Sequence, residues 1–177
     1  MSLSTLTIVH VALSLVGLVS GAVVLRAMLR SRMSAPVTAL FLLTTMATSL
    51  TGFVYPLTRI GLGQVVGVLC LLVVVPALLA LYSFRLTGRW RAVYAAGATA
   101  ALYLNAVIAV AQLFKKVAVL QPLMPSLTAP AFLAAQAVLL AVFVVLGEHA
   151  VRRFHPSLPR LGQPRRFPRR GDVTALT

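Results

Sequence analysis

Acidic side chains are almost absent from this chain. Among its 177 residues, two acids, Glu148 and Asp172, face sixteen lysines and arginines, which gives a formal net charge of +14. Both acids come at or after the end of the last apolar segment. No Ser-His-Asp set and no carboxylate-rich metal site can therefore form within the apolar part of the chain.

Cysteine and histidine are also scarce. The single Cys70 can form no internal disulfide and has no second thiol for a metal, so we interpret it as a small buried hydrophobe. A membrane haem needs paired histidines at matched depth, but His10 and His149 are expected near opposite faces and His155 follows the last segment. Neither a G-x-G-x-x-G nor a P-loop motif occurs. We therefore expect no cofactor, no metal and no enzymatic activity of the chain's own; a membrane enzyme would need a partner chain to supply the missing ligands.

Long apolar runs are what the sequence has in abundance. The composition is 60% hydrophobic and 10% charged, which is typical of an integral membrane protein rather than a soluble domain. An apolar helix of about 20 residues crosses the hydrocarbon core of a bilayer. We predict an all-α bundle of five transmembrane helices at residues 3–29, 37–55, 62–86, 90–114 and 131–151. They form one transmembrane domain, 1–155, followed by a disordered basic tail, 156–177.

The basic residues indicate the orientation. Thirteen of the sixteen fall on the side of the first loop, the third loop and the tail, and three fall on the other side. The positive-inside rule then predicts an N-terminus outside and a cytoplasmic C-terminus. We expect anionic lipid headgroups at the cytoplasmic face as partners, and no nucleic acid, because no basic face is interleaved with aromatics. The tail arginines expected to bind headgroups are Arg160, Arg165, Arg166, Arg169 and Arg170.

Polar side chains from several segments are expected at similar depths in the outer half of the bundle. A buried amide or imidazole costs free energy unless it is paired, so such groups are candidates for a ligand-binding site. The alternative is that they hydrogen-bond one another and hold the helices together. The candidates are His10, Thr48, Tyr55, Asn105, Gln112 and Gln136.

Local spacing adds three structural predictions. Gly17 and Gly21 form a small-xxx-small pair, which favours close approach of a neighbouring helix of the same chain. Pro76 lies inside the third segment and should kink it. Glu148 and Arg152 stand at i and i+4 in the favourable order, which predicts a modest surface ion pair.

Several runs resemble a family of small, uncharacterised bacterial membrane proteins with no established activity. They are Thr38 to Pro56, Ala101 to Ala106, Gln112 to Lys116, and Val144 to Gly147 with Arg152 to Phe154. The resemblance implies a multi-pass protein of the bacterial inner (cytoplasmic) membrane and gives no mechanism. We predict a non-enzymatic accessory or interaction role, with a second copy or an unidentified membrane protein as partner. The alternative is a module that binds or transports a small molecule, a quinone or a proton through the polar cluster.

Overall fold

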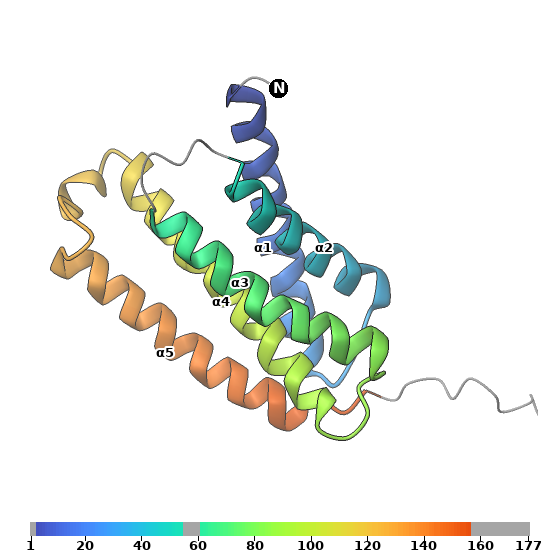
Figure 1. The fold of residues 1–177 in the computed structure, drawn as a ribbon. Helices are drawn as coiled ribbons and strands as arrows, with labels where there is room; N and C mark the ends of the chain where they lie inside the picture. The colour runs from blue at the N-terminus through green and yellow to red at the C-terminus, as the bar shows by residue number, and fades with distance from the viewer. Residues whose placement is uncertain (1–2, 55–60, 157–177) are drawn as a thin grey trace, which may run out of the picture.

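The computed structural model describes residues 3–54 and 61–156, and within these ranges all regular structure is helical (Figure 1). Five helices in this part of the chain are long and apolar enough to cross a membrane. The predicted helical class is therefore confirmed. The helices are α1 (Leu3–Leu29), α2 (Ala35–Gly52), α3 (Leu62–Leu78), α4 (Trp90–Lys116) and α5 (Pro130–Arg153), with two short turns, η1 (Leu79–Ser83) and η2 (Gln121–Leu123).

The helix ends differ from the predicted ones by a few residues. α2 begins at Ala35 rather than 37 because Pro36 sits in its first turn, where a missing N–H is no loss, and it ends at Gly52 rather than 55. α4 continues to Lys116, and α5 runs from Pro130 to Arg153. The predicted third helix is interrupted: α3 passes through Pro76 and gives way to the wider π-helical turn η1, in which the N–H of Phe84 bonds to the carbonyl of Leu79.

Helix α4 is the element against which most of the bundle packs. It contacts α1, α3 and α5, while α2 covers α1 and α3 (Figure 1). Its buried face is rich in small residues, including Ala95, Ala98 and Ala101, so neighbouring backbones come close. At Gly97 a Cβ atom would lie 2.9 Å from the carbonyl oxygen of Val73 on α3.

The predicted small-residue pair of α1 packs within the chain. A Cβ atom on Gly21 would lie 2.6 Å from side-chain atoms of both Phe41 on α2 and Leu102 on α4. Gly17 faces the same two helices one turn earlier. The pair thus lets α1 pack closely against both α2 and α4. This agrees with the four-residue spacing of the two glycines, which predicted close packing within the chain.

The C-terminal end of α5 closes the bundle at the end that carries the α1–α2 turn. Phe154, the residue after α5, is completely buried, and its ring lies 5.4 Å from that of the buried Tyr94 on α4. The backbone N–H of His155 donates to the hydroxyl of Ser31 at 2.8 Å. Elsewhere α5 is the least covered helix, with only Phe132 and Ala150 buried among its residues.

The turn between η1 and α4 has an unusual backbone. Arg85 and Leu86 both have positive φ angles, 47° and 56°, which residues other than glycine rarely adopt. Two contacts hold this conformation: the N–H of Leu86 bonds to the carbonyl of Ala80 at 2.9 Å, and the Leu86 side chain is buried. Beside it, Phe84 and Trp90 stack face to face with their ring centroids 3.7 Å apart.

Candidate functional site

His10 pairs with a threonine of α2. Its Nδ1 lies 2.9 Å from the hydroxyl of Thr51, and that hydroxyl donates to the carbonyl of Thr48 at 3.0 Å. Which of the two atoms donates depends on the tautomer of the imidazole: a hydroxyl has one proton, so Thr51 accepts from His10 only while it donates to the carbonyl of Thr48. The pair joins the first turns of α1 to the last turn of α2.

Asn105 pairs with a different threonine of α2. Its amide nitrogen donates to the hydroxyl of Thr45 at 3.2 Å, which links α4 to α2. A Cβ on Gly17 of α1 would lie 3.3 Å from the Thr45 hydroxyl and 3.6 Å from the Asn105 amide nitrogen. The absence of a side chain at Gly17 therefore lets α1 close over this bond.

The remaining candidates do not join these two pairs. The amide of Gln136 on α5 donates to the backbone carbonyl of Val107 on α4 at 3.2 Å. Gln112 is exposed on the side of α4. Tyr55 and the five tail arginines lie outside the described residues. Among the described residues the predicted polar cluster is thus resolved into three separate helix-to-helix contacts, His10–Thr51, Asn105–Thr45 and Gln136–Val107, which we call the three polar bridges.

Two buried polar atoms near the polar bridges have no hydrogen-bond partner among the described residues. They are the hydroxyl oxygen of Thr48, one turn before Thr51, and the side-chain carbonyl oxygen of Gln136. Two other hydroxyls of α2 behave as expected for threonine and serine in an apolar helix. Thr44 donates to the carbonyl of Leu40 and Ser49 to that of Thr45.

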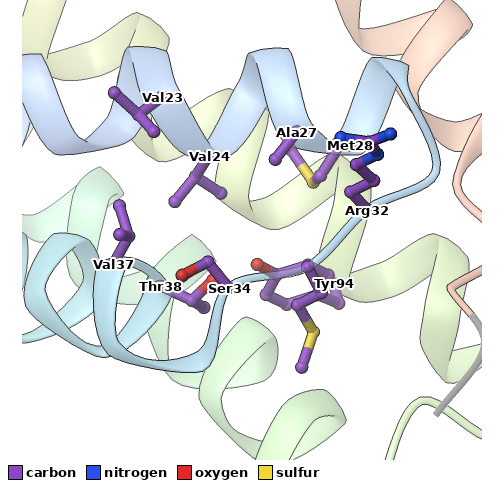
Figure 2. A pocket seen from close by; sticks show the side chains of 10 residues that line it. Val23, Val24, Ala27, Met28, Arg32, Ser34, Val37, Thr38 and Tyr94 are labelled. Carbon is purple, nitrogen blue, oxygen red and sulfur yellow. The ribbon is translucent and has the colours of Figure 1, made fainter.

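A cavity lies at the other end of the bundle, between α1, α2 and the start of α4 (Figure 2). Its walls are mostly apolar, with Val24, Met28 and Val37, and the Tyr94 hydroxyl points into it near Ser34 and Thr38. The space open to the centre of a water molecule is about 10 Å³, which is room for one water. The Tyr94 hydroxyl is buried beside Thr38 and makes no well-aligned hydrogen bond among the described residues, so the space suits a single bridging water better than a larger ligand.

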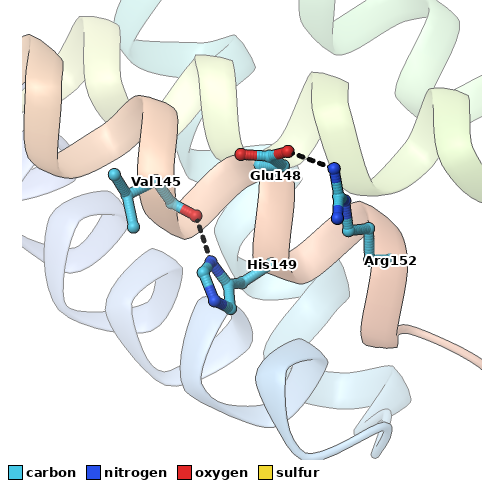
Figure 3. Close-up of polar contacts among 4 residues, drawn as sticks. All are labelled: Val145, Glu148, His149 and Arg152. Carbon is cyan, nitrogen blue, oxygen red and sulfur yellow. Dashed lines mark hydrogen bonds and ion pairs between the residues drawn. The ribbon is translucent and has the colours of Figure 1, made fainter.

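The predicted ion pair at the end of α5 is confirmed. Arg152 donates to the carboxylate of Glu148, and both side chains are exposed (Figure 3). One residue on, the Nδ1 of His149 donates to the carbonyl of Val145 at 2.8 Å. An exposed pair of this kind contributes about 0.3–0.5 kcal/mol and needs no chemical role.

The residue that sequence reasoning missed is Thr45. It is fully buried and accepts the bond from Asn105, whereas the threonine predicted as a candidate in this helix was Thr48. The available signal was the recurrence of Thr38, Thr45 and Gly52 at steps of seven, which places them on one face of α2. Within the described residues no three histidine, cysteine, aspartate or glutamate side chains come together as metal ligands would.

Comparison with known proteins leaves the chain without an assigned relative. No family model, no curated protein and no solved structure matches it. The resemblance to small bacterial membrane proteins therefore stays a prediction, and function has to be argued from the geometry of the polar bridges.

Proposed function

We propose that the chain is a non-enzymatic multi-pass protein of the bacterial inner membrane with an accessory or interaction role. In this proposal the intramembrane polar side chains are structural. The observation that supports it most is that His10, Asn105 and Gln136 each reach a partner on a neighbouring helix. A ligand site would instead keep such groups directed at a shared space, and the cavity described above lies away from all three. Such a bundle works through its lipid-facing and protein-facing surfaces, with a second copy or another membrane protein as partner.

A double-mutant cycle on Asn105 and Thr45 tests the structural role. Asn105→Leu and Thr45→Val should each lower the melting temperature in detergent, because each leaves the other partner unpaired in an apolar setting. The coupling between the two should be about 0.6–1.7 kcal/mol, the range of interhelical hydrogen bonds in membranes. Gln112→Leu is the matched control, since Gln112 lies on the same helix but is exposed, and it should melt like the parent protein.

The alternative function is binding or transport of a small molecule, a quinone or a proton. The observation in its favour is the unpartnered Thr48 hydroxyl beside the His10–Thr51 bridge. Polar groups kept for a ligand are usually held at a cost to stability, so Asn105→Leu and His10→Leu would then be neutral or stabilising. The same melting curves therefore separate the two proposals, and destabilisation by both variants would exclude this one.

We further propose that the N-terminus is outside and the C-terminus cytoplasmic. The arginines of the α1–α2 turn, the η1–α4 turn and the end of α5 then share the cytoplasmic side, as the positive-inside rule requires. In this orientation the tail arginines Arg160, Arg165, Arg166, Arg169 and Arg170 meet the anionic headgroups of the inner leaflet, each contributing about 1 kcal/mol near the surface.

A reporter fused after Thr177 tests the orientation. A reporter that works only in the periplasm should be inactive there, and one that works only in the cytoplasm should be active, because five spans place the two termini on opposite sides. Fusion of the same reporters within the α4–α5 loop is the internal control and should give the reverse pattern. A periplasmic signal from the C-terminal fusion would reject this orientation.

A further inference from the structure

The loop that joins α4 to α5, residues 117–129, is unusual for a connection because it is apolar and uncharged. It contains no lysine, arginine, aspartate or glutamate, although Lys115 and Lys116 immediately precede it. Val119 is 81% exposed, Leu123 48% and Leu127 47%. Valine and leucine at such exposure would be unfavourable in water, so this α4–α5 loop presents an apolar surface that needs an apolar environment.

The inner side of the α4–α5 loop is already occupied. Leu120 and Met124 pack on a small hydrophobic cluster that is separate from the main core and is formed by the ends of α4 and α5. Within the cluster the rings of Phe114 and Phe132 meet edge to face, with their centroids 5.6 Å apart. The exposed side chains of the loop therefore cannot turn inward without displacing Leu120 and Met124.

The backbone of the α4–α5 loop satisfies many of its own hydrogen-bonding groups. The N–H groups of Leu120 and Gln121 both bond to the carbonyl of Val117, and the short helix η2 follows directly. The side chain of Gln121 donates to the carbonyl of Lys115, which caps the end of α4. A segment with partly satisfied polar groups can enter the headgroup region at lower cost than an open loop, although hydrocarbon itself would still exclude it.

Helix lengths place the α4–α5 loop at the membrane boundary. α4 has 27 residues and is about 40 Å long, so it extends beyond a hydrocarbon core of about 30 Å. The part of α5 that precedes Glu148, from Pro130 to Gly147, measures about 27 Å and reaches only to the boundary. The loop must therefore descend through the headgroup layer to connect the two helices. Leu113 on α4 and Leu133 on α5, which flank the loop in sequence, are exposed as well.

We propose that the α4–α5 loop is a membrane-interface anchor, which lies in the headgroup layer with Val119, Leu123 and Leu127 inserted into the upper acyl chains. The proposal rests on the membrane setting of the proposed function but not on the orientation of the chain. The partner is the lipid surface itself, because the loop carries no charge that would select a polar or charged protein partner. Lys115 and Lys116 at its root are placed to reach the phosphates.

Tryptophan fluorescence in phospholipid vesicles tests the anchor. The parent for the experiment is Trp90→Phe, since Trp90 is the single tryptophan and phenylalanine keeps a ring stacked on Phe84. Val119→Trp in that parent should emit at shorter wavelength than tryptophan in water. Lipids brominated near the headgroup end of the acyl chain should quench it, and aqueous iodide should quench it only weakly. Leu127→Trp repeats the measurement should Val119→Trp fold poorly.

Leu133→Trp is the matched control on α5, because Leu133 is exposed in the first turn of a helix that crosses the bilayer in either orientation of the chain. Quenching of both tryptophans by brominated lipid supports the anchor. If Leu133→Trp is quenched by brominated lipid while Val119→Trp is quenched by iodide alone, the loop lies in water and the anchor is rejected, while the membrane bundle stands. If brominated lipid quenches neither tryptophan, both the membrane setting and the anchor are rejected.

Discussion

Gly97→Ala should lower the free energy of unfolding by about 1–3 kcal/mol, the usual cost of forcing an extra methyl group into a packed core. The added Cβ would lie 2.9 Å from the backbone carbonyl oxygen of Val73 and 3.1 Å from the Cβ of Ala77. Neither neighbour can rotate away, since one is main chain and the other has no rotatable side chain. Helices α3 and α4 must therefore separate, which loosens the contact on which much of the bundle depends.

The measurement is thermal unfolding in detergent, with Gly63→Ala as the matched control. Gly63 lies in α3 with no atom within 4 Å of its added Cβ. Alanine there should be neutral or slightly stabilising, because alanine favours a helix over glycine by about 1 kcal/mol in water. Equal melting temperatures for the two variants would show that α3 and α4 are not in close contact at Gly97.

Phe154→Ala should be the more destructive substitution, with an expected loss of about 3–5 kcal/mol for truncating a buried phenylalanine. The Phe154 side chain has no exposed surface and fills the space beside Tyr94, whose own ring is fully buried. Its removal leaves a cavity where the end of α5 meets the start of α4. Among the residues of α5 itself only Phe132 and Ala150 are buried, so few deeply buried side chains remain to compensate.

Two further variants make this result specific. Arg153→Ala, one residue earlier, changes an exposed side chain at the end of α5 and should alter the melting temperature little. Phe154→Leu keeps most of the apolar volume and should recover much of the lost stability. If Phe154→Ala and Arg153→Ala have the same melting temperature, the ring contact with Tyr94 contributes nothing measurable to stability.

The helices themselves could be predicted from the sequence because length and composition decide them. A run such as Leu3–Leu29 is long enough to span the hydrocarbon core, and it has too few polar groups for a helix on the surface of a soluble protein. The contact of α1 with its neighbours at Gly21 could also be anticipated, since small residues mark close approach in membranes. Likewise, the i, i+4 spacing was enough to pair Glu148 with Arg152.

The partners of the polar side chains could not be predicted. Sequence spacing gives the depth of a residue along its helix, but it does not give the rotation of that helix about its axis. His10 and Asn105 lie at comparable depths and were candidates to bond one another, yet each bonds a threonine of α2. Which hydroxyl of Thr44 and Thr45 faces α4 depends on a rotation of one residue, about 100°.

Phe154 was missed for a related reason. It follows two arginines and precedes a histidine, so its position along the chain indicates the membrane boundary, where an aromatic ring is expected to be half exposed. The chain instead leaves the helical direction at this residue, whose backbone is extended, and the ring is buried against Tyr94 of α4. A change of direction after a helix leaves no periodic signal from which it could be inferred.

The bond between His155 and Ser31 has a consequence for how the protein is made. It joins residues that are 124 positions apart, so it can form only after the ribosome has synthesised the whole helical part of the chain. Until then Tyr94 lacks the ring of Phe154 against it, although α1 to α4 can already pack on one another. Docking of the end of α5 thus completes the contacts at this end of the bundle. A chain that ended before Phe154 would leave the ring of Tyr94 without this contact.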